Sequence, residues 1–99
     1  MVQIIWTELA LSELEHIKEY ISFDSIVYAK NVVLKIRNKV KILKQFPKRG
    51  GRIPEIELEN YRQLIEGNYR IMYKISNNKV YILSIFHGAR DFGRTKIEG

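Results

Sequence analysis

The sequence has no cysteine among its 99 residues, and this absence excludes several classes of protein at once. Disulfide scaffolds, thiol catalysis and thiolate zinc sites all depend on cysteine. Histidine is almost as scarce, because His16 and His87 are the two present. Two histidines are too few for an all-protein transition-metal site, so we expect neither a metal nor another cofactor.

Long hydrophobic runs are also missing. No apolar stretch approaches the ~20 residues that a membrane span requires. Residues 1–6 lack the basic region and the long apolar stretch of a secretion signal. We therefore expect a cytoplasmic protein without a membrane partner, and a chain of this length predicts one domain over residues 1–99.

Acidic residues are absent from the middle third of the chain. The net charge is −4 over residues 1–24, +9 over residues 25–54 and +1 over residues 55–99. Such a basic block attracts phosphate or acidic protein, and it predicts a polyanionic partner. A solvated helix face is the alternative interpretation. The residues that we expect to meet the partner or a nucleic acid are Lys35, Arg37, Lys39, Lys41, Lys44, Lys48, Arg49 and Arg52.

The first half of the chain has helical periodicity. Thr7 offers an N-cap, and apolar residues recur on one face from Ala10 to Ile21, which predicts a helix over residues 8–22. A second helix is predicted over 25–45, ended by Pro47. A coiled coil is a minor alternative for this second segment. Its apolar stripe comprises Ile26, Ala29, Val33, Ile36, Val40 and Leu43.

The second half changes to a period of two residues. Strands are predicted over 61–66, 69–76 and 80–87, joined by turns at Gly67-Asn68 and Asn77-Asn78, with a polar tail from Gly88. A short strand is predicted over 2–6, and residues 47–60 read as a loop. The strand at 80–87 is nearly all apolar, which suggests an interior position. The order predicts an α+β fold in which an antiparallel helix hairpin packs on a small antiparallel sheet.

Five residues could carry acid–base or phosphate chemistry: Glu55, Arg62, Arg70, His87 and Arg90. Arginines on adjacent strands could clamp a phosphate, because a guanidinium matches phosphate oxygens. If the loop folds back over the sheet, the five could converge for metal-free RNA cleavage.

Structural roles compete with each of these functions. Arg62 and Arg70 could face solvent or pair with Glu66 and Glu55, and His87 could be structural. Trp6 is expected to anchor the helix pair in the core, and His16 is given no role. The tyrosines at 69 and 73 are expected to pack, with a stacking platform for single-stranded nucleic acid as the weaker alternative.

The order and spacing of several short motifs resemble a known group, the RelE/ParE superfamily of bacterial and archaeal type II toxin–antitoxin toxins. The resemblance spans nearly the whole chain. Its motifs are Trp6-Thr7 with Ala10 and Leu14, Tyr20-Ile21, Phe46-Pro47, Arg49-Gly50-Gly51-Arg52, Pro54-Glu55, Arg62-Gln63-Leu64-Ile65, Tyr69-Arg70-Ile71-Met72-Tyr73 and Phe86-His87-Gly88-Ala89-Arg90-Asp91.

The resemblance implies a growth-arrest toxin that binds a cognate antitoxin, in a hetero-oligomer. RelE-like members cut mRNA on the ribosome, whereas ParE-like members share the scaffold and poison DNA gyrase without being nucleases. The Tyr69–Tyr73 strand and the His87–Asp91 ending look more like the ParE branch. The nuclease role would fall to Arg70, Arg62, His87, Arg90 and Glu55 in a RelE-like protein. This sequence has no tyrosine after Tyr81, where nucleases typically use a tyrosine or histidine.

Overall fold

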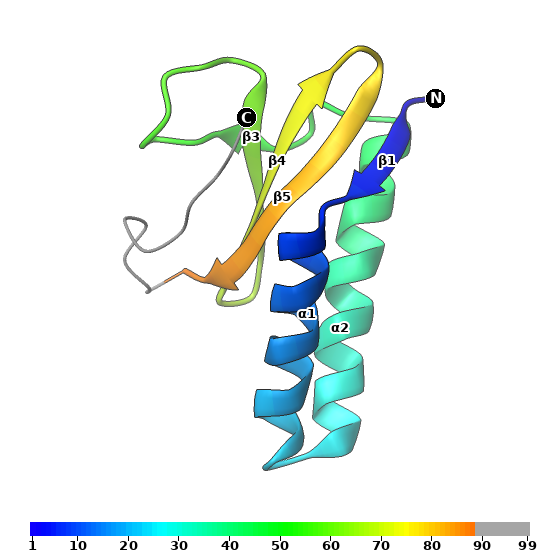
Figure 1. Ribbon diagram of the computed structural model, residues 1–99, viewed down its shortest axis with the longest axis vertical. Helices are drawn as coiled ribbons and strands as arrows, with labels where there is room; N and C mark the ends of the chain where they lie inside the picture. The colour runs from blue at the N-terminus through cyan, green and yellow to red at the C-terminus, as the bar shows by residue number, and fades with distance from the viewer. Residues whose placement is uncertain (89–99) are drawn as a thin grey trace.

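Two antiparallel helices pack against one face of a five-stranded sheet in a computed structural model, and the structure describes residues 1–88 (Figure 1). The helix hairpin extends beyond one end of the sheet, so its tip has no strand beneath it. The elements are β1 (Gln3–Trp6), α1 (Glu8–Ser22), α2 (Ile26–Lys41), the 3₁₀ turn η1 (Ile42–Lys44), β2 (Gly51–Arg52), β3 (Tyr61–Glu66), β4 (Tyr69–Ser76) and β5 (Lys79–His87).

The strand order in the sheet is β1-β5-β4-β3-β2. Strands β3, β4 and β5 form the predicted antiparallel meander, and β5 lies in the interior of the sheet as its apolar sequence indicates. The α+β class is therefore confirmed. Strand β1 pairs parallel to β5, which makes the sheet mixed. The predicted loop over 47–60 also contains the short strand β2, which pairs with β3 at Gln63 and Arg62.

Helix α1 begins and ends where the sequence predicts. Thr7 is extended, and its hydroxyl accepts a hydrogen bond from the Ala10 N–H, so one orphan donor of the first turn is satisfied. Ser25 caps α2 in the same way through the Tyr28 N–H. The second helix ends earlier than predicted, because the α-helix stops at Lys41 and one 3₁₀ turn continues to Lys44.

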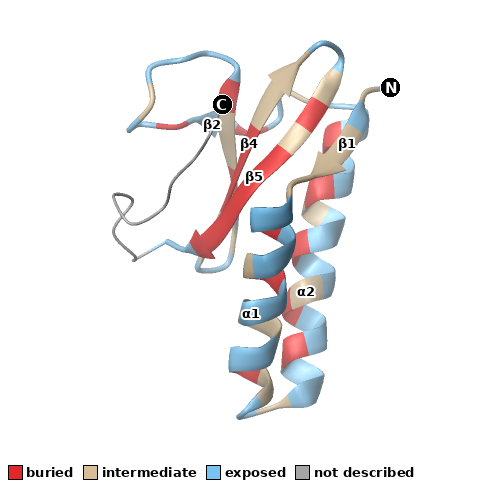
Figure 2. Ribbon diagram, viewed as in Figure 1, coloured by how far each residue is buried: buried red, intermediate tan, exposed pale blue. Residues whose placement is uncertain are grey.

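The buried stripe of α2 differs from the predicted one at its start. Ala29, Ile36 and Val40 are buried as expected, whereas Val32 takes the place of Val33 in the buried set. The prediction for Ile26 is wrong, since this side chain is 63% exposed near the tip of the hairpin. Figure 2 shows that buried residues of α2 follow one side of the helix. The spacing alone could not show that the sheet ends before the first turn of α2.

Tight turns set the register of the meander. Gly67 has φ +57°, and Asn77 and Asn78 have φ 51° and 60°, so both predicted hairpin turns use left-handed backbone. A register shift between Met72 and Tyr73 interrupts the pairing of β4 with β5. Beside it, the Ser84 hydroxyl and the Ile85 N–H both donate to the Glu13 carboxylate of α1. Among residues 1–88, no helix is long and apolar enough to cross a membrane.

Candidate functional site

The sheet face away from the helices is covered by the segment 47–60. Ile53 is inserted into a second apolar cluster with Met72 and Phe86, and Ile56 packs against it. The apolar side chains Ile53 and Ile56 explain why this polar, proline- and glycine-containing segment lies on the sheet. The fold-back on which the predicted site depends does occur, and it brings the Pro54-Glu55 turn over β4.

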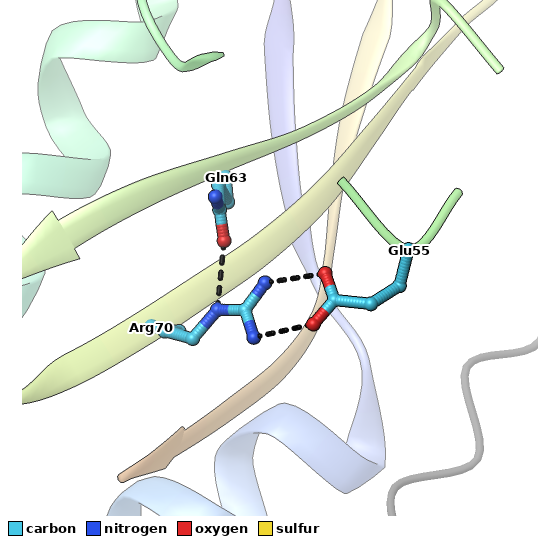
Figure 3. Close-up of polar contacts among 3 residues, drawn as sticks. All are labelled: Glu55, Gln63 and Arg70. Carbon is cyan, nitrogen blue, oxygen red and sulfur yellow. Dashed lines mark hydrogen bonds and ion pairs between the residues drawn. The ribbon is translucent and has the colours of Figure 1, made fainter. Parts of the chain in front are cut away.

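Glu55 and Arg70 form the central contact of the site (Figure 3). The guanidinium of Arg70 donates from both terminal nitrogens to the Glu55 carboxylate at 2.9 and 3.0 Å, while its Nε donates to Gln63 Oε1 at 2.8 Å. Its Cζ also lies 5.6 Å from the centre of the Phe86 ring. The hydrogen bonds from Arg70 lower the pKa of the Glu55 carboxyl below its ordinary value of 4.5. The pair therefore carries both charges at neutral pH.

Arg62 lies on the opposite face of the sheet. In the β3–β4 register Arg62 pairs with Tyr73, and Arg70 pairs with Ile65. Ile65 is three positions from Arg62 along β3, which is an odd number. Side chains alternate between faces along a strand, so Arg62 shares the helix-covered face with Tyr73. Its Nη1 donates to the Gly50 carbonyl at 2.8 Å. The prediction that Arg62 and Arg70 clamp one phosphate is therefore wrong, because the two side chains lie on opposite faces of the sheet.

Tyr73 fixes the start of the covering segment. Its hydroxyl donates to the Pro47 carbonyl at 2.7 Å and accepts from the Gly50 N–H at 2.9 Å. A Cβ on Gly50 would lie 2.7 Å from that hydroxyl and 2.5 Å from the Gln63 carbonyl oxygen, so the close approach requires glycine. Burial raises the pKa of Tyr73 above its ordinary value of 10.0, which keeps the phenol protonated as a donor.

His87 ends β5 on the helix side, away from Arg70. It pairs with Tyr69 across the strands, and their rings meet edge to face at 5.7 Å. Both line an open cavity of about 670 Å³ against α1, together with His16 and Glu13. No role is predicted for His16 from the sequence, and no sequence signal links it to His87, because a shared cavity requires the end of β5 to lie against α1. The predicted residue Arg90 and the polar tail after Gly88 lie outside the described residues.

The basic block is divided between the two flanks of α2 and the following turn. Lys39 pairs with Glu66 at 3.8 Å, so Glu66 is the partner of a helix lysine and not of Arg62. The guanidinium carbon of Arg37 lies 5.4 Å from the centre of the Trp6 ring. Trp6 packs against the core cluster, as predicted, but its side chain is only half-buried. The remaining members of the predicted set are exposed: Lys35, Lys41, Lys44, Lys48, Arg49 and Arg52. Within residues 1–88, no group of three acidic or histidine side chains could hold a metal ion.

Comparisons with known proteins agree on the kind of protein that this geometry resembles. The family described as the ParE toxin of the type II toxin–antitoxin system parDE matches residues 4–92. A protein named Toxin RelE2 from Caulobacter vibrioides is 31% identical over 91 residues, which cover 91% of this chain and 99% of the relative.

Solved structures share the fold. The chromosomal ParDE system from P. aeruginosa superposes with a TM-score of 0.73 at 26% identity, covering 88% of this chain and 96% of that chain. The toxin–antitoxin complex RelBE2 from Mycobacterium tuberculosis gives a TM-score of 0.54 at 22% identity, covering 87% and 96% respectively. At that identity the second likeness supports the fold alone.

Proposed function

Because the chain belongs to the ParE toxin family of type II toxin–antitoxin systems, we propose that it arrests growth by binding and inhibiting DNA gyrase. The observation that supports a binding protein over a nuclease is the dispersal of the candidate catalytic residues. Arg70 is held by Glu55 and Gln63 on one face of the sheet, and Arg62 is bonded to the loop on the other. Metal-free phosphodiester cleavage needs its base, acid and phosphate stabilisers around one bond.

The partner in the resting cell is a cognate antitoxin. The similar structure at 26% identity comes from a ParDE toxin–antitoxin system, which favours a hetero-oligomer for this chain too. We expect the antitoxin to place acidic residues against the basic block, because residues 25–54 contain no acid to repel them. Both the antitoxin and either target act in the cytoplasm, which is where we place the protein.

A RelE-like ribosome-dependent mRNA interferase is the second candidate. It is favoured by the 31% identity to Toxin RelE2 and by the Glu55–Arg70 pair, an acid and a phosphate-binding group in direct contact. In that mechanism Arg70 would stabilise phosphate and Glu55 would exchange the proton. Arg62 and His87 lie on the other face of the sheet, and Arg90 lies outside the described residues. The pair would have to open for Arg70 to reach a phosphate.

Two assays on the purified protein separate the candidates. We expect inhibition of gyrase in a plasmid supercoiling assay, and intact mRNA after incubation with ribosomes followed by primer extension. Arg70→Ala should leave gyrase inhibition within a few-fold of wild type, because that side chain works inside the toxin fold. Lys79→Ala, a charge change at a partly exposed position on another strand, is the matched control.

The opposite pattern would overturn the proposal. New mRNA ends that appear with ribosomes present, and that Arg70→Ala but not Lys79→Ala removes, would establish the interferase. Full gyrase activity in the presence of a folded toxin that still arrests cells would exclude the gyrase target.

A further inference from the structure

A straight row of cations runs along one flank of α2 and ends in the 3₁₀ turn η1. With about 100° of rotation per residue, Lys30, Arg37, Lys41 and Lys44 fall within a sector of about 60°. All four are exposed. The row is about 21 Å long at 1.5 Å per residue. The basic block of residues 25–54 is therefore not one surface. Lys35 and Lys39 lie about 140° and 180° round the helix from Lys30, and Lys39 is paired with Glu66.

The row borders a shallow pocket between α2 and the edge strand β1. Arg37, Lys41 and Lys44 line it from the helix, and Ile4 and Trp6 line it from β1, around a cavity of about 200 Å³. The Arg37 guanidinium lies over the Trp6 ring, 5.4 Å from its centre. This stacking orders the guanidinium before any ligand arrives, so less side-chain entropy is lost on binding.

We propose that this pocket and the row of cations, with Trp6, Arg37, Lys41 and Lys44 at the centre, bind the phosphodiester backbone of a nucleic acid. This inference goes beyond the proposed function, because direct binding needs neither gyrase nor a ribosome. Contacts from lysine and arginine to phosphate position a protein without reading sequence, so the site takes nucleic acid of any sequence.

Two observations favour a nucleic acid over an acidic peptide. The row is straight and spans several phosphates, since one strand of duplex presents a phosphate about every 3.4 Å. A half-buried indole at the centre of the cations adds a surface on which a base can stack, whereas carboxylates of a peptide gain nothing from it.

The sequence contains a single tryptophan, Trp6, so intrinsic fluorescence reports on this site directly. The purified chain is titrated at low salt with short single-stranded DNA, single-stranded RNA, duplex DNA and polyglutamate. The test variant is Lys41→Gln/Lys44→Gln. The control variant, Lys18→Gln/Lys35→Gln, removes the same charge from outside the row, and thermal melting verifies that both are folded.

We expect saturable quenching or a shift of Trp6 emission with nucleic acid, and affinity about tenfold lower in the test variant at low salt. Loss of two phosphate contacts should reduce the slope of log K against log salt by about 1.5, because each contact contributes 0.7–0.9. The control variant should stay within about twofold of wild type. The three nucleic acids together show whether a single strand, RNA or duplex is preferred.

Either of two results would overturn the proposal. Equal losses in the test and control variants would show that net charge alone attracts the polymer. Polyglutamate that binds as tightly as DNA, with the same fluorescence change, would assign the surface to an acidic protein. Neither result bears on gyrase inhibition, which is measured separately.

Discussion

The two faces of the sheet bury side chains equally well but hold their covers by different means. Ile36 of α2 is fully buried on one face, and Ile53 of the segment 47–60 is 1% exposed on the other. The helices are capped and internally bonded over their length, whereas the segment pairs with the sheet through the two residues of β2. The helices and the segment 47–60 therefore do not differ in how well they bury side chains. They differ in how much backbone hydrogen bonding holds them in place.

This difference separates scaffold from candidate site. The helix-covered face holds the larger core cluster, and the segment-covered face holds Glu55 against Arg70. Functional groups are commonly carried by loops on a rigid scaffold, and such loops open at lower free energy than the core. We expect the Glu55 side of the pair to move and the Arg70 side to stay fixed.

The largest expected effect contrasts the two buried isoleucines. Ile36→Ala should lower the free energy of global unfolding by about 4 kcal/mol, because the packed helices cannot close the cavity. Ile53→Ala removes the same atoms but should cost about 2 kcal/mol, since the segment can settle onto the sheet or open locally. Chemical denaturation measures both values.

Limited trypsin digestion shows where each variant loosens. Ile53→Ala should speed cleavage after Arg49 and Arg52 while the helices stay resistant, because the cover opens as a unit. Ile36→Ala should not open the segment locally. Its cleavage after Arg49 and Arg52 should rise only as much as the lower free energy of global unfolding explains. Equal destabilisation without faster cleavage in the Ile53 variant would show that both faces unfold together.

Two adjacent glycines give the next test. Gly50→Ala places a Cβ 2.5 Å from the Gln63 carbonyl and against the Tyr73 hydroxyl, while a Cβ on Gly51 meets nothing within 4 Å. We expect Gly50→Ala to cost about 2 kcal/mol, because backbone must shift and the two hydrogen bonds of Tyr73 weaken. Gly51→Ala should stay within about 0.5 kcal/mol of wild type. Thermal melting of the pair measures this, and similar melting temperatures would contradict the close approach.

Local signals predicted most of the scaffold. The Thr7 cap, the helical periodicity and the two turns gave α1, α2 and the meander, because each depends on residues near in sequence. The sequence also contained enough information to predict that Arg62 and Arg70 lie on opposite faces of the sheet. A two-residue turn at Gly67-Asn68 places residue 66 opposite 69, which leads by alternation to Arg62 opposite Tyr73.

The pairing of Glu55 with Arg70 depends on a different kind of information. Which residue of 47–60 meets β4 is decided by where Ile53 enters the second apolar cluster. The parallel pairing of β1 with β5 and the cavity that His16 and His87 both line likewise depend on how helices and sheet cross. These are long-range contacts, and no periodicity in one segment encodes them.

The smallest expected effect isolates the ion pair that links the segment to the sheet. The folded-state pKa of Glu55 is lowered by Arg70, so the pair contributes stability above the ordinary value of 4.5 and loses it as pH falls through the lower folded value. Glu55 is 37% exposed, and solvent screening limits the contribution to roughly 0.5 kcal/mol at pH 7.

Glu55→Gln keeps the shape of the side chain and removes its charge. The variant should be less stable than wild type at pH 7, and the difference should shrink below pH 4.5 until the curves meet, because the wild-type carboxyl is then also neutral. Glu57→Gln, an exposed change two residues along the same segment, controls for net charge. Urea unfolding midpoints of the three proteins, measured from pH 7 to below pH 4.5, test this prediction. A Glu55→Gln difference that persists unchanged at low pH would show that shape, and not charge, holds the segment against Arg70.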